Sequence, residues 1–411
     1  MTYFDAREHQ NPAQREAALM ERLPAQIAHA RAAAPAYARL LADIDPATIN
    51  SRAALARLPL TRKSDLAAEQ QKAHPFGGYA TIGWGPACRR VFASPGQLYE
   101  PEGAAADYHR MARALHAAGF RAGDLVHNTF SYHLTPAGSM METGAHALGC
   151  TVFPAGVGQT ELQLAAIADL RPQAYVGTPS FLRILLDKAD ELGIALSFTK
   201  AFVTAEAFPP SVREAFAARG IDAYEGYATA DLGLIAYQTA ARDGLVLDED
   251  IVVEIVRPGT GDPVEAGEVG EVVVSSFNPD YPLIRFATGD LSALLPGISP
   301  CGRTNGRIRG WLGRADQTTK VKGMFVHPGQ IAQIMQRHGE IRRARLVVDN
   351  PDHNDRMTLM CEVSGGGHEQ LAASIAASVR ELTKLRGEVA FLPKGVLAND
   401  GKLIDDQRSY R

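Results

Sequence analysis

The 411-residue sequence has few cysteines and no long apolar run. Its four cysteines (Cys88, Cys150, Cys301 and Cys361) are far apart and form no CxxC pair, which argues against a disulfide framework and against a zinc site of ordinary spacing. We expect them to pack as small hydrophobic side chains. No apolar run approaches the roughly 20 residues that span a bilayer, and the first ten residues contain no apolar signal-peptide core. The sequence therefore predicts a cytoplasmic protein with no membrane partner.

Charge of neither sign predominates. The 42 Lys and Arg residues against 46 Asp and Glu residues give a formal net charge of -4, so there is no electrostatic reason to expect nucleic acid as a partner. With 46% hydrophobic and 21% charged residues, the composition is that of an ordinary globular protein. The length favours two or three domains.

Several common catalytic and nucleotide-binding motifs are missing. Gly156-Val-Gly158 lacks the third glycine of a dinucleotide fingerprint. In GVLANDGK (395–402), five residues separate the glycines where a phosphate-binding P-loop has four, and Leu403 stands where that loop has Ser or Thr. No GxSxG segment supplies a hydrolase nucleophile.

The pattern of apolar residues predicts an α/β protein. Leu19, Leu23 and Ile27 are spaced as on one face of a helix within residues 12–33. From residue 108 to residue 205, predicted helices alternate with short predicted strands, and one helix begins at Pro179 and ends at Gly193. Such alternation is typical of a parallel sheet covered by helices on both sides. Residues 245–276 instead read as β-strands around the turn at 258–263, so a β-rich part is expected there.

From residue 314 onward, the pattern predicts a small α+β domain of about 95 residues. Its strands are expected at 342–349, 357–363 and 388–392, with a helix at 369–385. We therefore divide the chain into an N-terminal domain, residues 1–312, and a C-terminal domain, residues 313–411.

Four polar and glycine-rich segments follow one another in a fixed order: YEGYATADLG (224–233), YPLIRFATGDL (281–291), GRADQTTKVKGMFVHPGQI (313–331) and DGKLIDDQR (400–408). With them the sequence resembles the adenylate-forming enzyme superfamily, and more closely its phenylacetate-CoA ligase family. PAYARLL, LARLPLTRKSDL and LGCTVFPAGVGQTELQ extend the resemblance over nearly the whole chain. The resemblance implies a large nucleotide- and acid-binding domain followed by a small mobile lid that alternates between two orientations, one for each half-reaction.

The resemblance also implies roles for single residues. Asp290 in TGD corresponds to the acid that binds the ribose hydroxyls of ATP, and a carboxylate accepts such hydrogen bonds well. Tyr227 corresponds to the aromatic residue that stacks on adenine. Asp231 stands where the family has a glutamate that holds Mg²⁺. The further nucleotide-binding positions implied are Ser94, Gly96, Ala205, Glu206, Glu225, Gly226 and Arg314.

The C-terminal domain carries the remaining roles implied by the resemblance. Lys402 corresponds to the catalytic lysine that offsets negative charge while the acyl-adenylate forms, a role worth about 3 to 4 kcal/mol for a preorganised donor. Asp316 corresponds to the hinge of the lid. Lys322 and Gly323 lie on the loop expected to approach coenzyme A.

The stretch 91–103 departs from the family's phosphate loop. Only Ser94 and Gly96 keep the expected character, while Pro95 lacks an amide donor. Glu100 and Glu102 are expected to place negative charge where pyrophosphate is held.

By resemblance, the acid pocket is lined by Tyr132, His133, Thr204 and Ala228, a set that suits an aryl or a short, hydroxylated carboxylic acid better than a long fatty chain. For His133, a buried core position is an equal alternative. The implied function is an ATP-dependent acid-CoA ligase that uses ATP, Mg²⁺ and coenzyme A, and relatives also suggest a homodimer. Two alternatives stay open: an adenylating enzyme that loads a carrier protein or another acceptor, and a catalytically weak relative that binds a nucleotide or acyl-adenylate.

Overall fold

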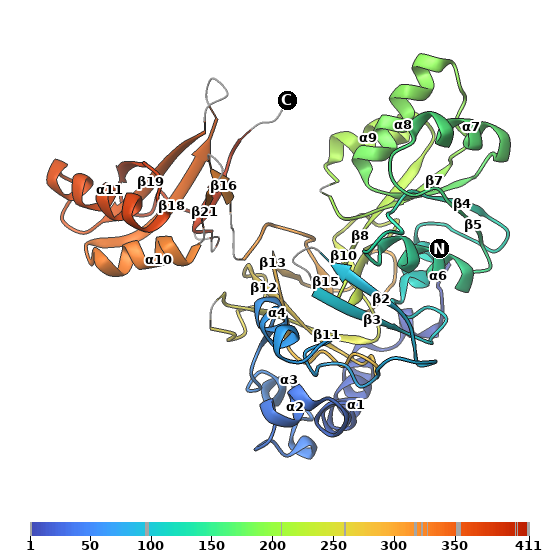
Figure 1. The fold of residues 1–411 in the computed structure, drawn as a ribbon, viewed down its shortest axis with the longest axis horizontal. Coiled ribbons are helices and arrows are strands. Elements are labelled where there is room, and N and C mark those ends of the chain that lie inside the picture. Colours follow the sequence, from blue (N-terminus) through green and yellow to red (C-terminus); the bar gives the residue numbers. More distant parts are fainter. Residues whose placement is uncertain are drawn as a thin grey trace. The chain divides into compact units, whose positions relative to one another are not determined.

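The computed structural model describes residues 2–94, 98–206, 208–258, 260–315, 319–321, 324–326, 328–350, 355–398, 400 and 402–408. The chain divides into two compact units (Figure 1). The first comprises Met1–Glu268, Val272–Thr288 and Ser292–Trp311, and the second comprises Val269–Glu271, Gly289–Leu291 and Leu312–Arg411. The sequence patterns do not predict that the two short segments around residues 270 and 290 group with the second unit.

The first unit begins with helices. Asn11 caps α1 (Pro12–Ala33), since its side chain accepts hydrogen bonds from the amides of Ala13 and Gln14, and Pro12 suits the first helical position. Leu23 and Ile27 are buried as their spacing predicts. The short elements that accompany α1 are η1 (Ala6–His9), α2 (Pro35–Leu40), η2 (Pro46–Thr48), α3 (Arg52–Leu55) and α4 (Lys63–Lys72).

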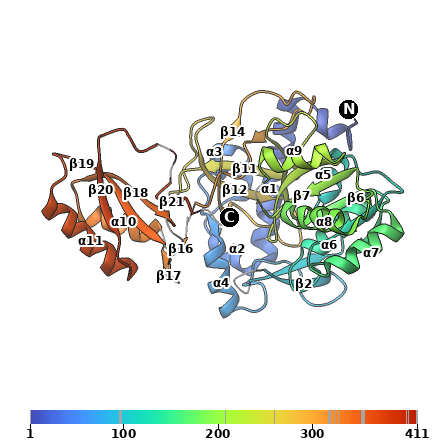
Figure 2. The ribbon, with the colours of Figure 1, turned by 90° about the horizontal axis from the view of Figure 1, so that it is seen from above.

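A nine-stranded sheet forms the centre of this unit, in the order β14-β15-β10-β9-β8-β7-β6-β4-β5. The five strands from β5 to β8 are parallel, and the pairs from β8 to β14 are antiparallel. Figure 2 shows helices α5 to α9 gathered around the parallel strands. The strands are β4 (Leu125–Asn128), β5 (Thr151–Pro154), β6 (Ala174–Gly177), β7 (Lys200–Val203), β8 (Asp222–Thr229), β9 (Gly233–Gln238), β10 (Leu245–Leu247), β14 (Leu294–Leu295) and β15 (Arg307–Ile308).

The helices of this part confirm the predicted alternation. In α8 the Thr178 side chain accepts a hydrogen bond from the Phe181 amide, Pro179 begins the helix, and Gly193 ends it at a φ of +66°. One boundary differs: the helix expected from residue 108 begins at Met111, after Arg110 in a left-handed conformation. The five helices are α5 (Met111–Ala117), α6 (Ala137–Ala147), α7 (Thr160–Leu170), α8 (Pro179–Leu192) and α9 (Pro210–Ala218).

Two smaller sheets complete the β-rich part. One has the order β1-β13-β12-β11, with strands β1 (Thr61–Arg62), β11 (Ile251–Val256), β12 (Gly270–Ser276) and β13 (Phe286–Ser292). The other is the antiparallel pair β2 (Cys88–Ser94) and β3 (Leu98–Gly103). The strands β10, β11 and β12 lie within the β-rich stretch that the sequence predicts.

The second unit has its own core, built around a sheet of order β20-β19-β18-β21. This part is the predicted α+β arrangement, and Ile375 and Val379 of its long helix are fully buried. Its elements are β16 (Thr319–Val321), β17 (Met324–Val326), α10 (Pro328–Arg337), β18 (Ile341–Asp349), β19 (Arg356–Val363), α11 (Glu369–Thr383), β20 (Glu388–Leu392) and β21 (Ile404–Asp406).

All four cysteines are free thiols, and three of them, Cys150, Cys301 and Cys361, are buried as the composition suggests. Among the described residues, every helix is too short or too polar to cross a membrane.

Candidate active site

Separate predicted residues come together where the parallel strand β7 ends beside the middle of β8. Val203 pairs with Glu225, so the segment that follows β7 runs beside the part of β8 that continues past this parallel pairing. There the Thr204 hydroxyl donates a hydrogen bond to the Gly226 carbonyl at 2.7 Å. Ligands of open α/β sheets bind beyond the carboxyl ends of the strands. Thr204 follows the carboxyl end of β7, where such ligands bind, and the site roles of Thr204 and Gly226 stay predictions.

Two backbone features distinguish this edge. Ala205 has a φ of +70°, a left-handed conformation that non-glycine residues rarely adopt. Gly226 is required by packing, because an added Cβ would lie 2.2 Å from Cζ of the buried Phe202 ring. The glycine therefore allows β8 to pass close over the core.

The two predicted acidic residues have protein partners. Glu206 is exposed and accepts hydrogen bonds from the Ser180 amide at 3.2 Å and the Ser180 hydroxyl at 2.8 Å, at the start of α8. Glu225 accepts from Gln238 Nε2 at 3.2 Å. Burial raises the pKa of Glu225 above its usual value, and the positive charge of Arg213 opposes this. The nucleotide role of both carboxylates stays a prediction.

Tyr227 and Ala228 lie at an irregular point of β8. The pairing with β9 shifts register between these two residues, and such a bulge redirects side chains. The Tyr227 hydroxyl donates to Thr288 Oγ1 at 3.1 Å, and the Thr288 hydroxyl donates to the Val272 carbonyl at 3.0 Å. This hydrogen bond fixes the half-buried Tyr227 ring through its hydroxyl group. A ring fixed in this way is suited to stacking on a planar base.

The predicted acid-pocket residues Tyr132 and His133 differ in burial. Asn128 Nδ2 donates to the Tyr132 hydroxyl at 2.8 Å. Burial, followed by a hydrogen bond to Glu142, raises the pKa of Tyr132. His133 is exposed, so its alternative interpretation as a core histidine is wrong. A pocket role for both residues remains a prediction.

A buried polar cluster lies where β3, α4 and the segment after β8 meet. Lys63 Nζ and Asp231 Oδ2 are 2.9 Å apart, and the Asp231 side chain is only 2% exposed. The Ser94 hydroxyl donates to Glu100 Oε1 at 2.5 Å. Burial, reinforced by the negative charge of Asp231, raises the pKa of Glu100 to about 8. Glu100 is therefore predominantly protonated at neutral pH.

This cluster corrects the expectation of negative charge on the phosphate loop. Glu100 is neutral at pH 7, as its raised pKa requires. Glu102 is buried and accepts hydrogen bonds from Arg90 Nη1 at 2.6 Å and the Ser139 hydroxyl at 2.8 Å, so its charge is balanced. Neither carboxylate presents an unbalanced charge. Gly96, the other predicted phosphate-loop residue, lies outside the described residues.

The cluster does not fit a preformed magnesium site. Asp231 already pairs with Lys63, and among the described residues no three His, Cys, Asp or Glu side chains gather in an arrangement that could hold a metal ion. We therefore assign no step to a metal held by Asp231. No role was assigned to Lys63 from the sequence. A signal for it was present, since Lys63 stands in the segment LARLPLTRKSDL, which carries the family resemblance.

Within the second unit, Asp290 and Arg314 form a pair. Arg314 Nη1 is 3.1 Å from Asp290 Oδ1, and the two residues also form an isolated antiparallel bridge. Gly289 has a φ of +75°, and an added Cβ would lie 2.6 Å from Arg314 Nη2. Glycine in the TGD segment of β13 thus makes room for the guanidinium group beside the carboxylate. The pair offers adjacent donors and acceptors for ribose hydroxyls.

Arg285, the residue directly before β13, is structural. Its guanidinium group donates to Glu254 Oε2 at 3.1 Å and to the carbonyls of Ala56, Leu58 and Gly261 at 2.6 to 2.7 Å. The side chain is 3% exposed. It gives no separate support for a ribose site.

Lys402 is half-buried in the second unit. Its ammonium group is 3.7 Å from Asp405 Oδ1, and its amide donates to Asp400 Oδ1 at 3.1 Å. The long ion pair leaves the ammonium group weakly held. Asp316, Lys322 and Gly323 lie outside the described residues, so their hinge and coenzyme A roles stay predictions.

The class of protein follows from a family model. The model for AMP-binding enzymes matches residues 106–278. This stretch contains β7, β8 and the Thr204–Gly226 contact. The chain is therefore placed among the adenylate-forming enzymes, as its motifs predict.

Relatives narrow the family. A phenylacetate-CoA ligase of Aromatoleum evansii is 32% identical over 364 residues, which cover 84% of this chain and 81% of the relative. One of Thermus thermophilus is 31% identical over 396 residues, covering 90% and 87%. The chain belongs to the phenylacetate-CoA ligase family. Its fold is shared with an open conformation of a 2-hydroxyisobutyryl-CoA ligase, with a TM-score of 0.73 at 24% identity over 99% of this chain and 96% of that one.

Proposed function

We propose that this protein is an ATP-dependent, AMP-forming acid-CoA ligase for an aryl or short carboxylic acid, with or without a hydroxyl group. In the first half-reaction, a carboxylate oxygen of the acid bonds to the α-phosphorus of ATP and the bond to pyrophosphate breaks. In the second, the thiol sulfur of coenzyme A bonds to the acyl carbon, the thiol proton is lost, and AMP leaves. The observation that carries the proposal is the buried Asp290 carboxylate in the TGD segment of β13, paired with Arg314, in a chain of this family.

The residues would divide the work as follows. Asp290 accepts hydrogen bonds from the ribose hydroxyls, and Arg314 orients that carboxylate or donates to ribose and phosphate oxygens. Tyr227 offers its ring to adenine. Lys402 brings positive charge to the reacting carboxylate and α-phosphate, because its ammonium group is only weakly held by Asp405. Mg²⁺ would enter with ATP, and the chain's own residues support no step through it.

The altered phosphate loop is compatible with binding an anion. The pKa of Glu100 is raised to about 8 and Arg90 balances Glu102, so the loop lacks the excess negative charge that its composition suggests. Lys63, one-third exposed beside Asp231, is a cation in the same cluster. The small, mixed polar lining from Tyr132, Thr204 and Ala228 supports a compact acid. A homodimer and residence in the cytoplasm also stay predictions.

The test separates the two half-reactions. Acid-dependent exchange of labelled pyrophosphate into ATP is measured over a panel of aryl, hydroxy and short aliphatic acids and palmitate, in the wild type, Lys402→Ala and Lys394→Ala. We expect exchange with one compact acid class, a loss of about 100- to 1,000-fold in Lys402→Ala, and wild-type exchange in Lys394→Ala, an exposed lysine of the same unit. Thioester formation from supplied acyl-adenylate should survive in Lys402→Ala. Equal loss of both half-reactions, or a preference for palmitate, would contradict the proposal.

A second candidate function is nucleotide or acyl-adenylate binding without efficient turnover. The specific observation that favours it is the Ser94 hydroxyl, which donates to the buried Glu100 and is therefore engaged where the family uses it for phosphate. Tight AMP binding with no exchange for any acid would establish this alternative. A third reading, transfer to a carrier protein, would be indicated if a thiol carrier outcompeted coenzyme A as acceptor.

A further inference from the structure

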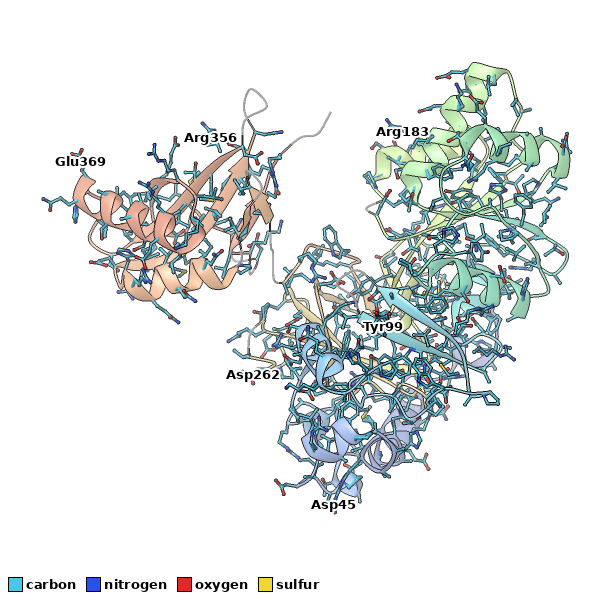
Figure 3. All side chains as sticks on the ribbon, in the orientation of Figure 1. Asp45, Tyr99, Arg183, Asp262, Arg356 and Glu369 are labelled. Atoms are coloured by element: carbon cyan, nitrogen blue, oxygen red, sulfur yellow. The ribbon has the colours of Figure 1, made fainter. Side chains whose placement is uncertain are left out.

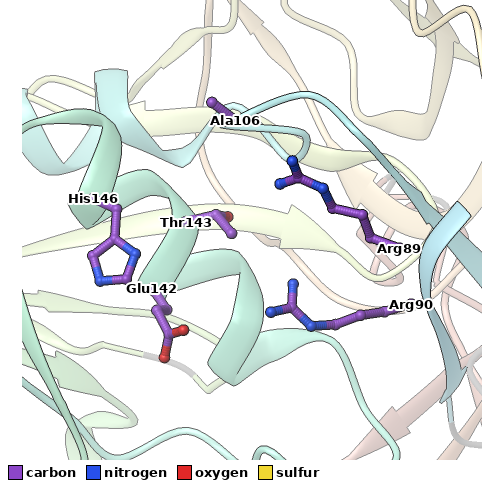
Figure 4. Close-up of a pocket in the computed structure, with 6 residues that line it drawn as sticks. All are labelled: Arg89, Arg90, Ala106, Glu142, Thr143 and His146. Carbon is purple, nitrogen blue, oxygen red and sulfur yellow. The ribbon is translucent and has the colours of Figure 1, made fainter. Parts of the chain in front are cut away.

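A pocket of about 490 Å³ lies between the hairpin β2–β3 and helix α6. None of the residues assigned above to nucleotide and acid lines it, although its residue Glu142 forms a hydrogen bond with the predicted acid-pocket residue Tyr132. The pocket is lined by Arg89, Arg90, Ala106, Glu142, Thr143 and His146. Figure 4 shows both guanidinium groups extending from the strand toward the helix. The volume is within the range of pockets that hold small ligands.

A β-bulge accounts for the two neighbouring arginines on one side. Cys88 pairs with Gly103 and Arg90 pairs with Glu102, so two steps along β2 match one step along β3 and Arg89 is the extra residue. In a regular strand, adjacent side chains point to opposite faces, whereas a bulge turns the extra one aside. The bulge thus places two guanidinium groups at the pocket instead of one.

The two arginines contribute differently. Arg90 Nη1 donates to Glu102 Oε1 at 2.6 Å and to the Ser139 hydroxyl at 3.0 Å, which fixes the guanidinium group and balances its charge. Arg89 is exposed, and within the described part of the chain no acceptor or carboxylate is recorded for it. Arg89 therefore supplies uncompensated positive charge, and Arg90 supplies donors that are already oriented. Arginine forks match the paired oxygens of a phosphate group.

The facing wall carries groups of another kind. Glu142 and His146 are four residues apart on α6 and so share one face of the helix. Thr143 lies between them, and its hydroxyl donates to the Ser139 carbonyl at 2.9 Å. Glu142 is a hydrogen-bond acceptor that a bare phosphate ion would not use but that a ribose hydroxyl or a base amino group would. The pocket thus offers cationic donors on one wall and an acceptor on the other.

We propose that this pocket binds a phosphorylated nucleoside, with the phosphate monoester on Arg89 and Arg90 and the nucleoside toward Glu142 and His146. Two ligands have this chemical structure. One is the 3′-phosphoadenosine end of coenzyme A, and this possibility rests on the proposed ligase function. The other is a free nucleotide that binds as an effector.

Arg89→Gln is the diagnostic variant. It removes an exposed charge, whereas Arg90→Gln would leave Glu102 buried without its cation and could unfold the hairpin. His146→Gln is a second exposed change in the same pocket. Arg183→Gln is the matched control, since this arginine extends from α8 with a side chain 69% exposed, outside the pocket (Figure 3). Unchanged circular dichroism and melting temperature establish that each variant folds.

The first measurement is calorimetric binding of adenosine 3′,5′-bisphosphate, with inorganic phosphate as a second probe, which needs no enzyme turnover. We expect binding in the wild type and Arg183→Gln, weakened about 10-fold in Arg89→Gln, with a smaller loss in His146→Gln and much weaker binding of phosphate alone. Equal affinity of wild type and Arg89→Gln for the bisphosphate, or no binding to either, overturns the proposal. Because this binding measurement does not depend on turnover, its result holds even if the protein shows no ligase activity.

The second measurement distinguishes the two ligands. The KM values for coenzyme A and for dephospho-coenzyme A, which lacks the 3′-phosphate, are compared in wild type and Arg89→Gln. If the wild type prefers coenzyme A and the variant loses this preference while kcat is unchanged, the pocket holds the end of coenzyme A. If the bisphosphate affinity falls in Arg89→Gln but the two KM values do not change, the ligand is a free nucleotide.

Discussion

Replacing Glu100 by glutamine removes one ionisable group from the buried cluster with Ser94, Lys63 and Asp231. Glutamine keeps the oxygen that accepts the Ser94 hydrogen bond, at 2.5 Å in the wild type, and changes little in volume. The glutamine NH₂ group takes the position of Glu100 Oε2, which is buried with no hydrogen-bond partner among the described residues. The substitution therefore isolates the effect of charge.

The expected effect depends on pH. Burial and the charge of Asp231 raise the pKa of Glu100 from 4.5 to about 8 in the folded chain. Because the folded state holds this proton more tightly than the unfolded state, unfolding near neutral pH releases a proton, and stability falls as pH rises from about 4.5 to about 8. Between pH 6 and 8, one proton corresponds to at most about 3 kcal/mol. Glu100→Gln should lose this dependence.

The assay is urea-induced unfolding followed by circular dichroism at pH 6, 7, 8 and 9. We expect wild type and Glu100→Gln to be of similar stability at pH 6, and the variant to be more stable at pH 9 by up to about 3 kcal/mol. Glu161→Gln, at an exposed position in the first turn of α7, should follow the wild-type curve. Parallel pH profiles for wild type and Glu100→Gln would refute the reasoning, because Glu100 would then be charged at neutral pH.

Two further predictions concern packing and a buried ion pair. Gly226→Ala should lower the free energy of unfolding by about 1 to 3 kcal/mol, because its Cβ would lie 2.2 Å from Cζ of Phe202. As a control, Gly83→Ala should melt like the wild type, because an added Cβ there would have no atom within 4 Å. Equal melting temperatures for both variants would contradict the packing argument. Arg285→Met should lower stability by about 3 to 5 kcal/mol by leaving Glu254 buried without its cation. Restoration of part of that loss in Arg285→Met/Glu254→Gln, measured by urea unfolding, would confirm the contribution of the unpaired carboxylate, since the carbonyls of Ala56, Leu58 and Gly261 lose their donor in both variants. An unchanged single variant would exclude it.

Local sequence information was sufficient for most of the architecture. The helix from Pro179 to Leu192 ends at Gly193 as predicted, because its cap, its apolar spacing and its terminal glycine all act within a few residues. The family resemblance, carried by the TGD and GRAD segments, is confirmed by relatives at about 30% identity. Asp290 and Arg314 stand in those segments, so the motifs identified both residues, whereas their pairing is seen only in the structure.

The tertiary structure decided what depends on burial and on contacts between distant residues. Lys63 and Asp231 are 168 positions apart, and no local pattern pairs them. Glu100 and Glu102 read as negative charges in the sequence, yet one is neutralised by its raised pKa and the other by Arg90. The bulge at Arg89 is set by the register of two strands. Chain-local chemistry thus determined the elements and the family, whereas desolvation and strand register, which arise only on folding, determined the charge and direction of the side chains.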